Sequence, residues 1–541
     1  MTHETRVIGA SGAPGAGEGD PIGPASPSRL GWSALALWVP LGLGVAFTFG
    51  HSVDDAFITL RFARNLIEGH GLAFNPGQRV EGYSSPLHLA VGLASNVGAG
   101  GHALFASKLA SLTFLALTAW RAQGVVASLP VARSARLVAL LLIGSSYPLA
   151  IAGGNGLETS LYALLLVVLI DAHARGAAED RPWSLGVVAA LVVLVRPEGV
   201  AVIVTVAMVT ALRRPVGSST RSFRWILVPG GVVVLATLAR LAYFGAIVPN
   251  TYFAKSVPFG PAVRSGVGYL AWSVVPESAY IPRSLAGVIG DLLLLWVGAV
   301  VVVGGIVALR SRCWFGCVAV VGAQVAFVLL SGGDWMRGSR FVAPIVVPTV
   351  VLVAFGLDGL MRWGSSRSPQ LGRSLGAVGA VLLIGASAVS WVRLPTFPVW
   401  ELSGVDDRAL VVDGGYGGSW GAIPDLLACA RPGDAVATTE IGFVGWSRPD
   451  LEIMDLSGLT DRTIATGAPT ASRWIIGVGE PDWNDDEAFV VQEVVRRSPE
   501  LVIVSAVPEP GSAVGRRYRA EGVVEVDGWT LTALVRRDRA C

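Results

Sequence analysis

Charged residues are scarce in this 541-residue sequence. Asp, Glu, Lys and Arg make up 15% of the chain, hydrophobic residues make up 52%, and the mean hydropathy is +0.59. A soluble domain carries about a quarter charged residues, so a wholly soluble protein is excluded. Dense basic stripes that would bind a nucleic-acid backbone are also missing. We therefore expect a membrane protein with the lipid bilayer as a partner and no nucleic acid.

Cysteine is equally scarce, with four residues in the whole chain. Four cysteines are too few for a disulfide framework. Cys313 and Cys317 lie at a predicted helix end, whereas Cys429 and Cys541 lie near the C-terminus, where pairing is open. The favoured expectation is four unpaired thiols.

The charges that are present divide the chain into two parts. Residues 1–400 hold 28 Lys and Arg against 16 Asp and Glu, and residues 401–541 hold 13 against 23. The first 30 residues are rich in Gly, Pro, Ser and Ala without periodicity, which is typical of a disordered leader. We expect a leader at 1–30, a transmembrane domain at 31–393 and a soluble α/β domain at 394–541.

Long apolar runs recur along the middle unit. A helix needs about 20 mostly apolar residues to cross a bilayer. The pair at 184–212 is short for two spans, but Arg196-Pro197-Glu198 interrupts it, and one lipid-exposed helix would tolerate that sequence poorly. The run 87–97 is too short and predicts a re-entrant or interfacial helix. Eleven spans are predicted, at 31–50, 103–120, 136–152, 159–174, 184–195, 199–212, 225–246, 285–309, 314–331, 341–361 and 375–392.

Short Arg-rich loops set the predicted orientation. Cytoplasmic loops are enriched in Lys and Arg, and the loops at 121–136, 175–181, 213–224, 310–312 and 362–373 all fall on one side of the eleven-span scheme. The expected protein is a multi-pass protein of the plasma (inner) membrane. Its N-terminus is cytoplasmic and its C-terminal domain is extracytoplasmic, as an odd number of spans requires.

The pattern changes after residue 411 to short β-like runs separated by a helical one. Buried strands are predicted at 435–439, 451–455 and 501–505, an amphipathic helix at 485–497, and a hairpin at 523–535 around Asp527-Gly528. The tail is therefore predicted to be a small α/β domain.

Asp54 and Asp55 directly follow the first predicted span. Adjacent carboxylates repel each other, and partial burial raises the pKa of at least one. Such a group suits general-base chemistry on a sugar hydroxyl, or holds a divalent cation against a phosphate. Asp is also a preferred helix cap. The sequence leaves function and capping evenly balanced.

Polar motifs also stand at four other predicted outer ends. Each has a simpler explanation: a helix cap for Glu158, an internal ion pair for Arg196 and Glu198, and interfacial anchoring for the Lys and Arg side chains. Together they offer carboxylates and cations in one crevice beside lipid, which is what transfer from a lipid phosphate requires. The motifs are Gly153–Thr159, Arg196–Glu198, Pro249–Lys255 and Gly332–Phe341.

These motifs resemble the terminal arabinofuranosyltransferases of cell-wall arabinan, which have the C-type glycosyltransferase fold. The first motif is long, running from Asp54 to Tyr83, and the others are short. The resemblance spans nearly the whole chain beyond the leader. It is carried by residues 54–59, 61–72, 74–77, 80–83, 156–159, 196–199, 249–252 with Lys255, 333–334, 340–341, 438–442, 455–456 and 458–461.

The resemblance implies an extracytoplasmic transferase that uses a polyprenyl-phosphate sugar, decaprenylphosphoryl arabinofuranose in that group. Asp54 becomes the first choice for the catalytic base, with Asp55 as its partner. The acceptor would be an envelope glycan, lipid or protein. No cofactor is certain, and a divalent cation (Mg, Mn or Ca) is possible. The expected donor- or acceptor-binding residues are Glu81, Tyr83, Glu158, Arg196, Glu198, Asn250, Lys255, Asp334, Arg337 and Arg340.

Ser84–His88 departs from the pattern, which leaves the arabinan acceptor less certain than the chemistry. A transporter or flippase of a lipid-linked sugar is the first alternative. The polar residues are predicted at span ends without internal duplication, whereas transporters place them near the midplane of related halves. A scaffold with a carbohydrate-binding tail is the second alternative, and it leaves Asp54 and Asp55 unexplained.

Overall fold

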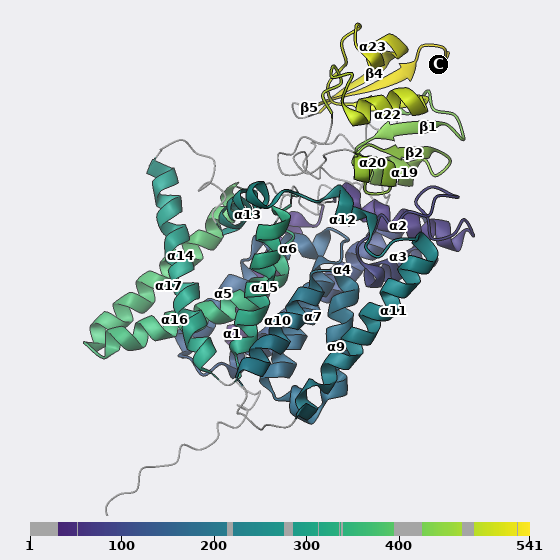
Figure 1. Cartoon of the computed structure of the whole chain (residues 1–541). Helices are drawn as coiled ribbons and strands as arrows, with labels where there is room; N and C mark the ends of the chain where they lie inside the picture. Colours follow the sequence, from purple (N-terminus) through teal and green to yellow (C-terminus); the bar gives the residue numbers. More distant parts are fainter. Residues whose placement is uncertain are drawn as a thin grey trace, which may run out of the picture.

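The chain folds into a helical body with a small α/β domain, the tail, at one end (Figure 1). A computed structural model describes residues 31–50, 52–213, 220–274, 285–311, 313–334, 336, 339–393, 425–467, 481–526 and 529–541. The predicted leader, most of the segment joining body and tail, and the predicted turn at Asp527-Gly528 lie outside these residues.

Apolar helices occupy all eleven positions predicted for membrane spans. Five stretches are long and apolar enough to cross a membrane, namely Ala103–Ser128, Phe223–Phe244, Gly290–Arg310, Ala343–Ser365 and Pro369–Val392. The chain is therefore a multi-pass membrane protein, while the number of crossings stays a prediction. The helices are α1 (Gly31–Thr48), α4 (Ala103–Ser128), α5 (Arg133–Gly144) with α6 (Tyr147–Gly154), α7 (Thr159–Ala174), α9 (Pro182–Val195), α10 (Gly199–Leu212), α11 (Leu227–Phe244), α14 (Leu285–Arg310), α15 (Phe315–Ser331), α16 (Val346–Ser365) and α17 (Pro369–Arg393).

Two breaks interrupt these helices. The predicted break at Arg196 is confirmed: α9 ends at Val195, and Arg196 is extended because a residue before proline disfavours helical geometry. The prediction of one continuous helix for the third span, 136–152, was wrong. The span bends by 42° between α5 and α6, where Ser146 caps α6 and Pro148 follows in the first turn.

Shorter helices gather at the tail end of the body (Figure 1). They are α2 (Asp54–Ile67), α3 (Pro86–Ala99), α12 (Asn250–Ala254) and α13 (Phe259–Val274). A helix was expected at the position of α3. No helix was predicted at the position of α13, because this helix is amphipathic and lacks a 20-residue apolar run. The remaining short elements are α8 (Ala177–Asp180) and the 3₁₀ turns η2 (Gly100–His102), η3 (Thr220–Ile226) and η4 (Ala343–Ile345).

The tail contains a five-stranded mixed sheet with strand order β2-β1-β3-β5-β4. β1 pairs in parallel with β2 and β3, and the β4–β5 hairpin pairs antiparallel with β3. The predicted strands and hairpin are confirmed. The predicted helix at 485–497 begins only at Phe489, because Asp485 accepts hydrogen bonds in a turn before it. The strands are β1 (Ala435–Thr438), β2 (Glu452–Asp455), β3 (Leu501–Val504), β4 (Tyr518–Val526) and β5 (Trp529–Arg536). The helices are α19 (Ile441–Ser447), α20 (Arg462–Gly467), α22 (Phe489–Arg497) and α23 (Ala513–Arg517).

The expectation of four free thiols was wrong. Cys429 and Cys541 form a disulfide whose Cα atoms lie 5.0 Å apart. Arg539 pairs with Asp434 at 2.7 Å just before β1, which draws the C-terminal residues back against the start of the domain. Cys313 and Cys317 are free.

The tail docks on the body through α19, which packs against α2. Asp54 is 4% exposed, and its two carboxylate oxygens accept the backbone N–H groups of Gly442 (2.8 Å) and Phe443 (2.7 Å). It therefore caps the N-terminus of α19 rather than its own helix, whose cap position is Val53. Burial raises the pKa of Asp54 to about 8, and the two N–H donors act in the opposite direction.

Glycines allow α19 to approach α2 this closely. A Cβ atom on Gly442 would lie 2.0 Å from the main-chain oxygen of Asp54, and one on Gly445 would lie 2.4 Å from Nη1 of Arg61. Arg61 is buried and donates to the carbonyl oxygens of Phe74 (2.8 Å), Gly445 (2.5 Å) and Leu451 (3.0 Å). One guanidinium thus joins α2, the following loop and the tail.

Within the body, α14 and α16 are in close backbone contact at two glycines, one on each helix. A Cβ atom on Gly304 would lie 1.8 Å from the carbonyl oxygen of Leu352, and one on Gly356 would lie 2.1 Å from that of Val300. Small residues at such crossings let membrane helices pack backbone to backbone. A Cβ atom on the neighbouring Gly305 would meet nothing within 4 Å.

We predict that Gly304→Ala lowers the melting temperature of the detergent-solubilised protein by several degrees, because α14 must move away from α16. Gly305→Ala is the matched control. It should leave the melting temperature unchanged or raise it slightly, since alanine favours a helix over glycine by about 1 kcal/mol. Equal effects of the two substitutions would contradict the crossing.

Gly442→Ala should loosen the tail without unfolding it, since the new methyl group collides with α2. The measurement is hydrogen exchange of the amides at 441–447 and 54–60, which should become at least tenfold faster. Gly511→Ala is the control, because a Cβ atom there meets nothing within 4 Å. Unchanged exchange in the Gly442 variant would argue against the docking.

Candidate functional site

Asp55, the residue after Asp54, pairs with cations at the ends of the body helices. Its side chain is 17% exposed and pairs with Arg340 at 3.1 Å and with Lys255 at 3.9 Å. Arg340 also pairs with Asp334 at 2.7 Å. Lys255 directly follows α12, and Arg340 lies between α15 and η4. Segments that are far apart in the sequence therefore meet at one carboxylate.

A second set of ion pairs forms at the break between α9 and α10. Arg196 pairs with Glu198 at 2.7 Å and with Glu158, the residue before α7. The sequence left open whether Glu158 caps α7. In the structure its side chain makes no capping hydrogen bond and pairs with Arg196 instead. The extended backbone at Arg196 frees its side chain from the helix and turns it toward Glu158.

The two sets meet at the ring of Phe341. The guanidinium carbon of Arg196 lies 5.0 Å from the ring centroid and that of Arg340 lies 5.3 Å from it. Arg340 also interacts electrostatically with Glu158. We call the assembled residues the polar cluster. It holds three cations and four carboxylates: Asp55, Glu158, Arg196, Glu198, Lys255, Asp334 and Arg340.

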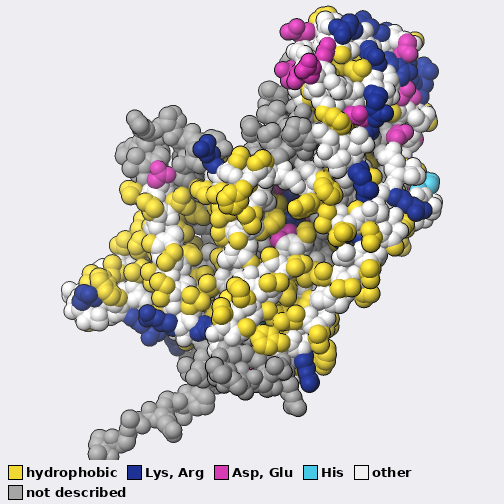
Figure 2. Space-filling model, viewed as in Figure 1, with side chains coloured by type: hydrophobic (Ala, Val, Ile, Leu, Met, Phe, Trp, Pro, Cys, Tyr) yellow, Lys and Arg dark blue, Asp and Glu magenta, His cyan; other side chains and the backbone are white. Residues whose placement is uncertain are grey.

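The cluster lies at the tail end of the body, because Asp55 directly follows Asp54, which is bonded to α19. Figure 2 shows acidic side chains in a hollow between apolar surfaces near this end. Six of its seven members have side chains at most 17% exposed, and Lys255 is 33% exposed. Burial removes water that would screen these charges, so each interaction with an incoming anion or hydroxyl is stronger than at an open surface.

Sequence reasoning missed several polar groups around the cluster. The hydroxyl of Tyr269 on α13 accepts the N–H of Phe341 at 3.1 Å. The hydroxyl of Tyr162 is buried and has no hydrogen-bond partner in the described part of the chain. His88 is buried and interacts electrostatically with Glu158. The sequence carries no signal for the two tyrosines: Tyr162 lies within an apolar span, and Tyr269 lies on an amphipathic helix outside the predicted spans.

Three predicted binding residues lie elsewhere, in the contact between body and tail. Glu81 forms an ion pair with Arg240 of α11. Tyr83 is buried, with its ring 5.1 Å from that of Phe62. The side-chain amide of Asn250 donates to the carbonyl oxygens of Gly458 (2.7 Å) and Leu459 (3.1 Å). All three side chains therefore take part in packing and hydrogen bonding away from the polar cluster. The fourth predicted residue outside the cluster, Arg337, lies outside the described residues.

The turn that receives Asn250 is held by Asp455 at the end of β2. This fully buried carboxylate accepts hydrogen bonds from the backbone and hydroxyl of Ser457, from the backbone of Gly458, and from both the backbone and hydroxyl of Thr460. Burial raises the pKa of Asp455, and the surrounding donors oppose that shift. Asp455 therefore belongs to the docking surface of the tail.

The carboxylates of the cluster do not fit a divalent cation. Asp55 and Asp334 both face Arg340, and Glu158 and Glu198 both face Arg196. Among described residues, the one group whose three ligand atoms converge is Cys429, Glu521 and Cys541, where the sulfurs are joined. A metal at the cluster would have to displace a guanidinium.

Comparison with known proteins supports the motif resemblance. The chain is 27% identical over 417 residues to the terminal β-(1→2)-arabinofuranosyltransferase of Mycobacterium tuberculosis, covering 69% of this chain and 63% of that protein. It is 29% identical over 349 residues to the protein of the same name from Corynebacterium glutamicum, covering 55% and 47%. The chain thus spans less than two thirds of the length of either relative.

Two further comparisons concern the tail and the whole fold. Residues 422–539 match a family model described as a domain of unknown function, DUF8728. Crystal structures of ArnT from Cupriavidus metallidurans, in the apo state and bound to undecaprenyl phosphate, align over 94% of this chain and 98% of theirs. Their TM-scores are 0.49 and 0.47, at 13% identity. By sequence, this chain is similar to terminal β-(1→2)-arabinofuranosyltransferases.

Proposed function

We propose that the chain is a membrane glycosyltransferase of the C-type fold. It moves a sugar, with arabinofuranose as the first choice, from a polyprenyl-phosphate donor to an envelope glycan, lipid or protein on the extracytoplasmic face. The polar cluster carries the proposal, because one partly exposed carboxylate lies between two cations beside apolar helices. The names of the two curated relatives support the activity.

The structure favours Asp55 over Asp54 as the base. Both oxygens of Asp54 accept backbone N–H groups of α19, so Asp54 is a positioning residue. Asp55 remains partly exposed, and its neighbours are cations. A general base needs an oxygen that the acceptor hydroxyl can reach. The side chain of Asp55 is partly exposed, whereas both oxygens of Asp54 are engaged by the tail.

The proposed transfer is a substitution at the anomeric carbon. The acceptor oxygen forms a bond to that carbon, the bond from the carbon to the phosphate oxygen breaks, and Asp55 takes the hydroxyl proton. The polyprenyl phosphate leaves with the bonding electrons, and Arg340 and Lys255 stabilise its growing charge. No step is assigned to a divalent cation.

The disulfide supports an extracytoplasmic tail. Disulfides persist in oxidising compartments and are rare in the cytosol, and Cys429–Cys541 lies within the tail. The Arg-rich loops independently predict the same orientation. The polar cluster lies at the tail end of the body and would therefore face the same compartment.

We predict that Asp55→Asn lowers transfer from a panel of polyprenyl-phosphate sugars by a factor of about 10²–10⁴, the usual contribution of a general base. The assay measures new glycosidic product in proteoliposomes. Hydrogen exchange at 441–447 should stay unchanged, because the hydrogen bonds to α19 are accepted by Asp54. Glu68→Gln, on the exposed end of the same helix, is the control and should keep full activity.

Asp54→Asn separates the two roles. It should speed exchange at 441–447 and reduce transfer less than Asp55→Asn does. Full turnover in the Asp55 variant, together with loss of activity and intact docking in the Asp54 variant, would reverse the assignment. Movement of labelled lipid across the vesicle without glycosidic product from any donor would instead favour a flippase.

A further inference from the structure

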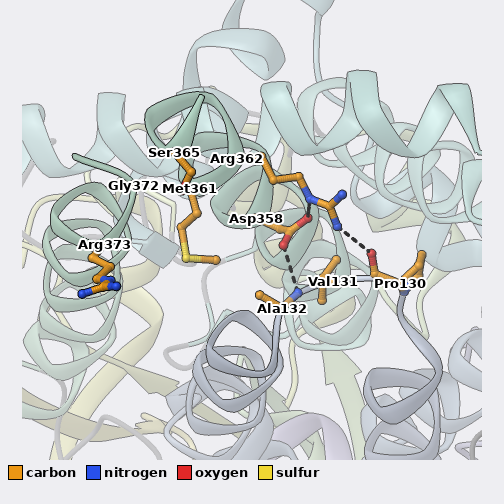
Figure 3. Close-up of a pocket in the computed structure, with 9 residues that line it drawn as sticks. All are labelled: Pro130, Val131, Ala132, Asp358, Met361, Arg362, Ser365, Gly372 and Arg373. Carbon is orange, nitrogen blue, oxygen red and sulfur yellow. Dashed lines mark hydrogen bonds and ion pairs between the residues drawn. The ribbon is translucent and has the colours of Figure 1, made fainter. Parts of the chain in front are cut away.

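A second polar site lies at the end of the body opposite the tail. A pocket of about 480 Å³ opens between the α4–α5 turn and the α16–α17 hairpin. Figure 3 shows Met361 between Arg373 on one side and Asp358 with Arg362 on the other. The lining residues are Pro130, Val131, Ala132, Asp358, Met361, Arg362, Ser365, Gly372 and Arg373.

Two arginines and one carboxylate line the pocket, which leaves it with a net positive charge. Asp358 accepts the N–H of Ala132 at 2.9 Å and pairs with Arg362 at 2.6 Å, so both its oxygens are engaged. Arg373 is exposed and makes no ion pair within the described residues. Arg133, which begins α5 beside the pocket, is also exposed. Two cationic side chains thus remain available for an anion.

The pocket also lies at the margin of the apolar surface. Figure 2 shows hydrophobic side chains over the flank of the body and Lys or Arg side chains along its lower edge. On α17, Val378 is 56% exposed and Val381 is 69% exposed. These residues follow Arg373 by about 7.5 and 12 Å along the helix axis, at 1.5 Å per residue. Trp363, 53% exposed on α16, is of the type that anchors helices at headgroup level.

We propose that this pocket binds the phosphate of an anionic phospholipid, with the acyl chains lying along the apolar face of α17. Guanidinium groups bind phosphate oxygens through paired hydrogen bonds, and basic pockets between membrane helices select anionic headgroups. The apolar surface that begins beside Arg373 favours a lipid over a free anion. This site is separate from the polar cluster and does not depend on the proposed transferase activity.

The test uses the purified full chain in a neutral detergent. Native mass spectrometry measures binding of phosphatidylglycerol, phosphatidylcholine and inorganic phosphate, and a thermal melt reports stabilisation. We expect phosphatidylglycerol to bind at least tenfold more tightly than phosphatidylcholine and to raise the melting temperature. Inorganic phosphate should do neither at the same concentration.

Arg373→Gln should weaken phosphatidylglycerol binding about tenfold while the lipid-free melting temperature stays the same, because Arg373 supports no described ion pair. Arg367→Gln is the matched control. It removes the same charge from the same hairpin, but its guanidinium stacks on Trp363 at 3.8 Å and does not line the pocket. This variant should bind as tightly as the unaltered chain.

Three results would overturn the proposal. Equal losses in the two variants would mean general attraction to a basic surface. Equal binding of the two phospholipids would remove the anionic headgroup as the ligand. Inorganic phosphate that stabilises as well as phosphatidylglycerol would make the pocket a site for a free anion.

Discussion

The capping of α19 by Asp54 is the contact on which the rest of the arrangement depends. One buried carboxylate takes two backbone N–H groups of the tail, and the glycine contacts at Gly442 and Gly445 make that approach possible. Because Asp54 begins α2, its anchoring also fixes the rotation of that helix. Successive helical residues point about 100° apart, so a helix held through Asp54 turns Asp55 toward Arg340 and Lys255.

The polar cluster is organised so that its charges nearly cancel before any substrate arrives. Each arginine is shared by two carboxylates, which offsets the cost of burying it. Lys255, the most exposed member, pairs with Asp55 at 3.9 Å. A phosphate that enters would draw Lys255 and Arg340 away from Asp55. In the proposed transfer, donor binding would thus free Asp55 to accept the proton of the acceptor hydroxyl.

Much of the fold follows from the sequence because it rests on local rules. Apolar runs located the helices, Pro197 located the break at Arg196, and β-rich runs located β1, β2 and β3. The site depends on contacts between segments that are far apart in the sequence, and local sequence patterns do not predict such contacts. Adjacent Asp54 and Asp55 look equivalent in sequence and diverge only once α19 docks. Tyr269 stands on an amphipathic helix without a membrane-length run, and Cys541 meets Cys429 only after the sheet closes.

The most direct test of the division between Asp54 and Asp55 is an experimental structure of the full chain with a non-cleavable phosphonate analogue of a polyprenyl-phosphate sugar. We predict phosphonate oxygens within hydrogen-bond distance of Arg340 or Lys255. We also predict Asp55 beside the anomeric carbon and Asp54 still bound to the N–H groups of Gly442 and Phe443. An analogue that contacts Asp54 after α19 has moved away, or that binds outside the polar cluster, would contradict this division.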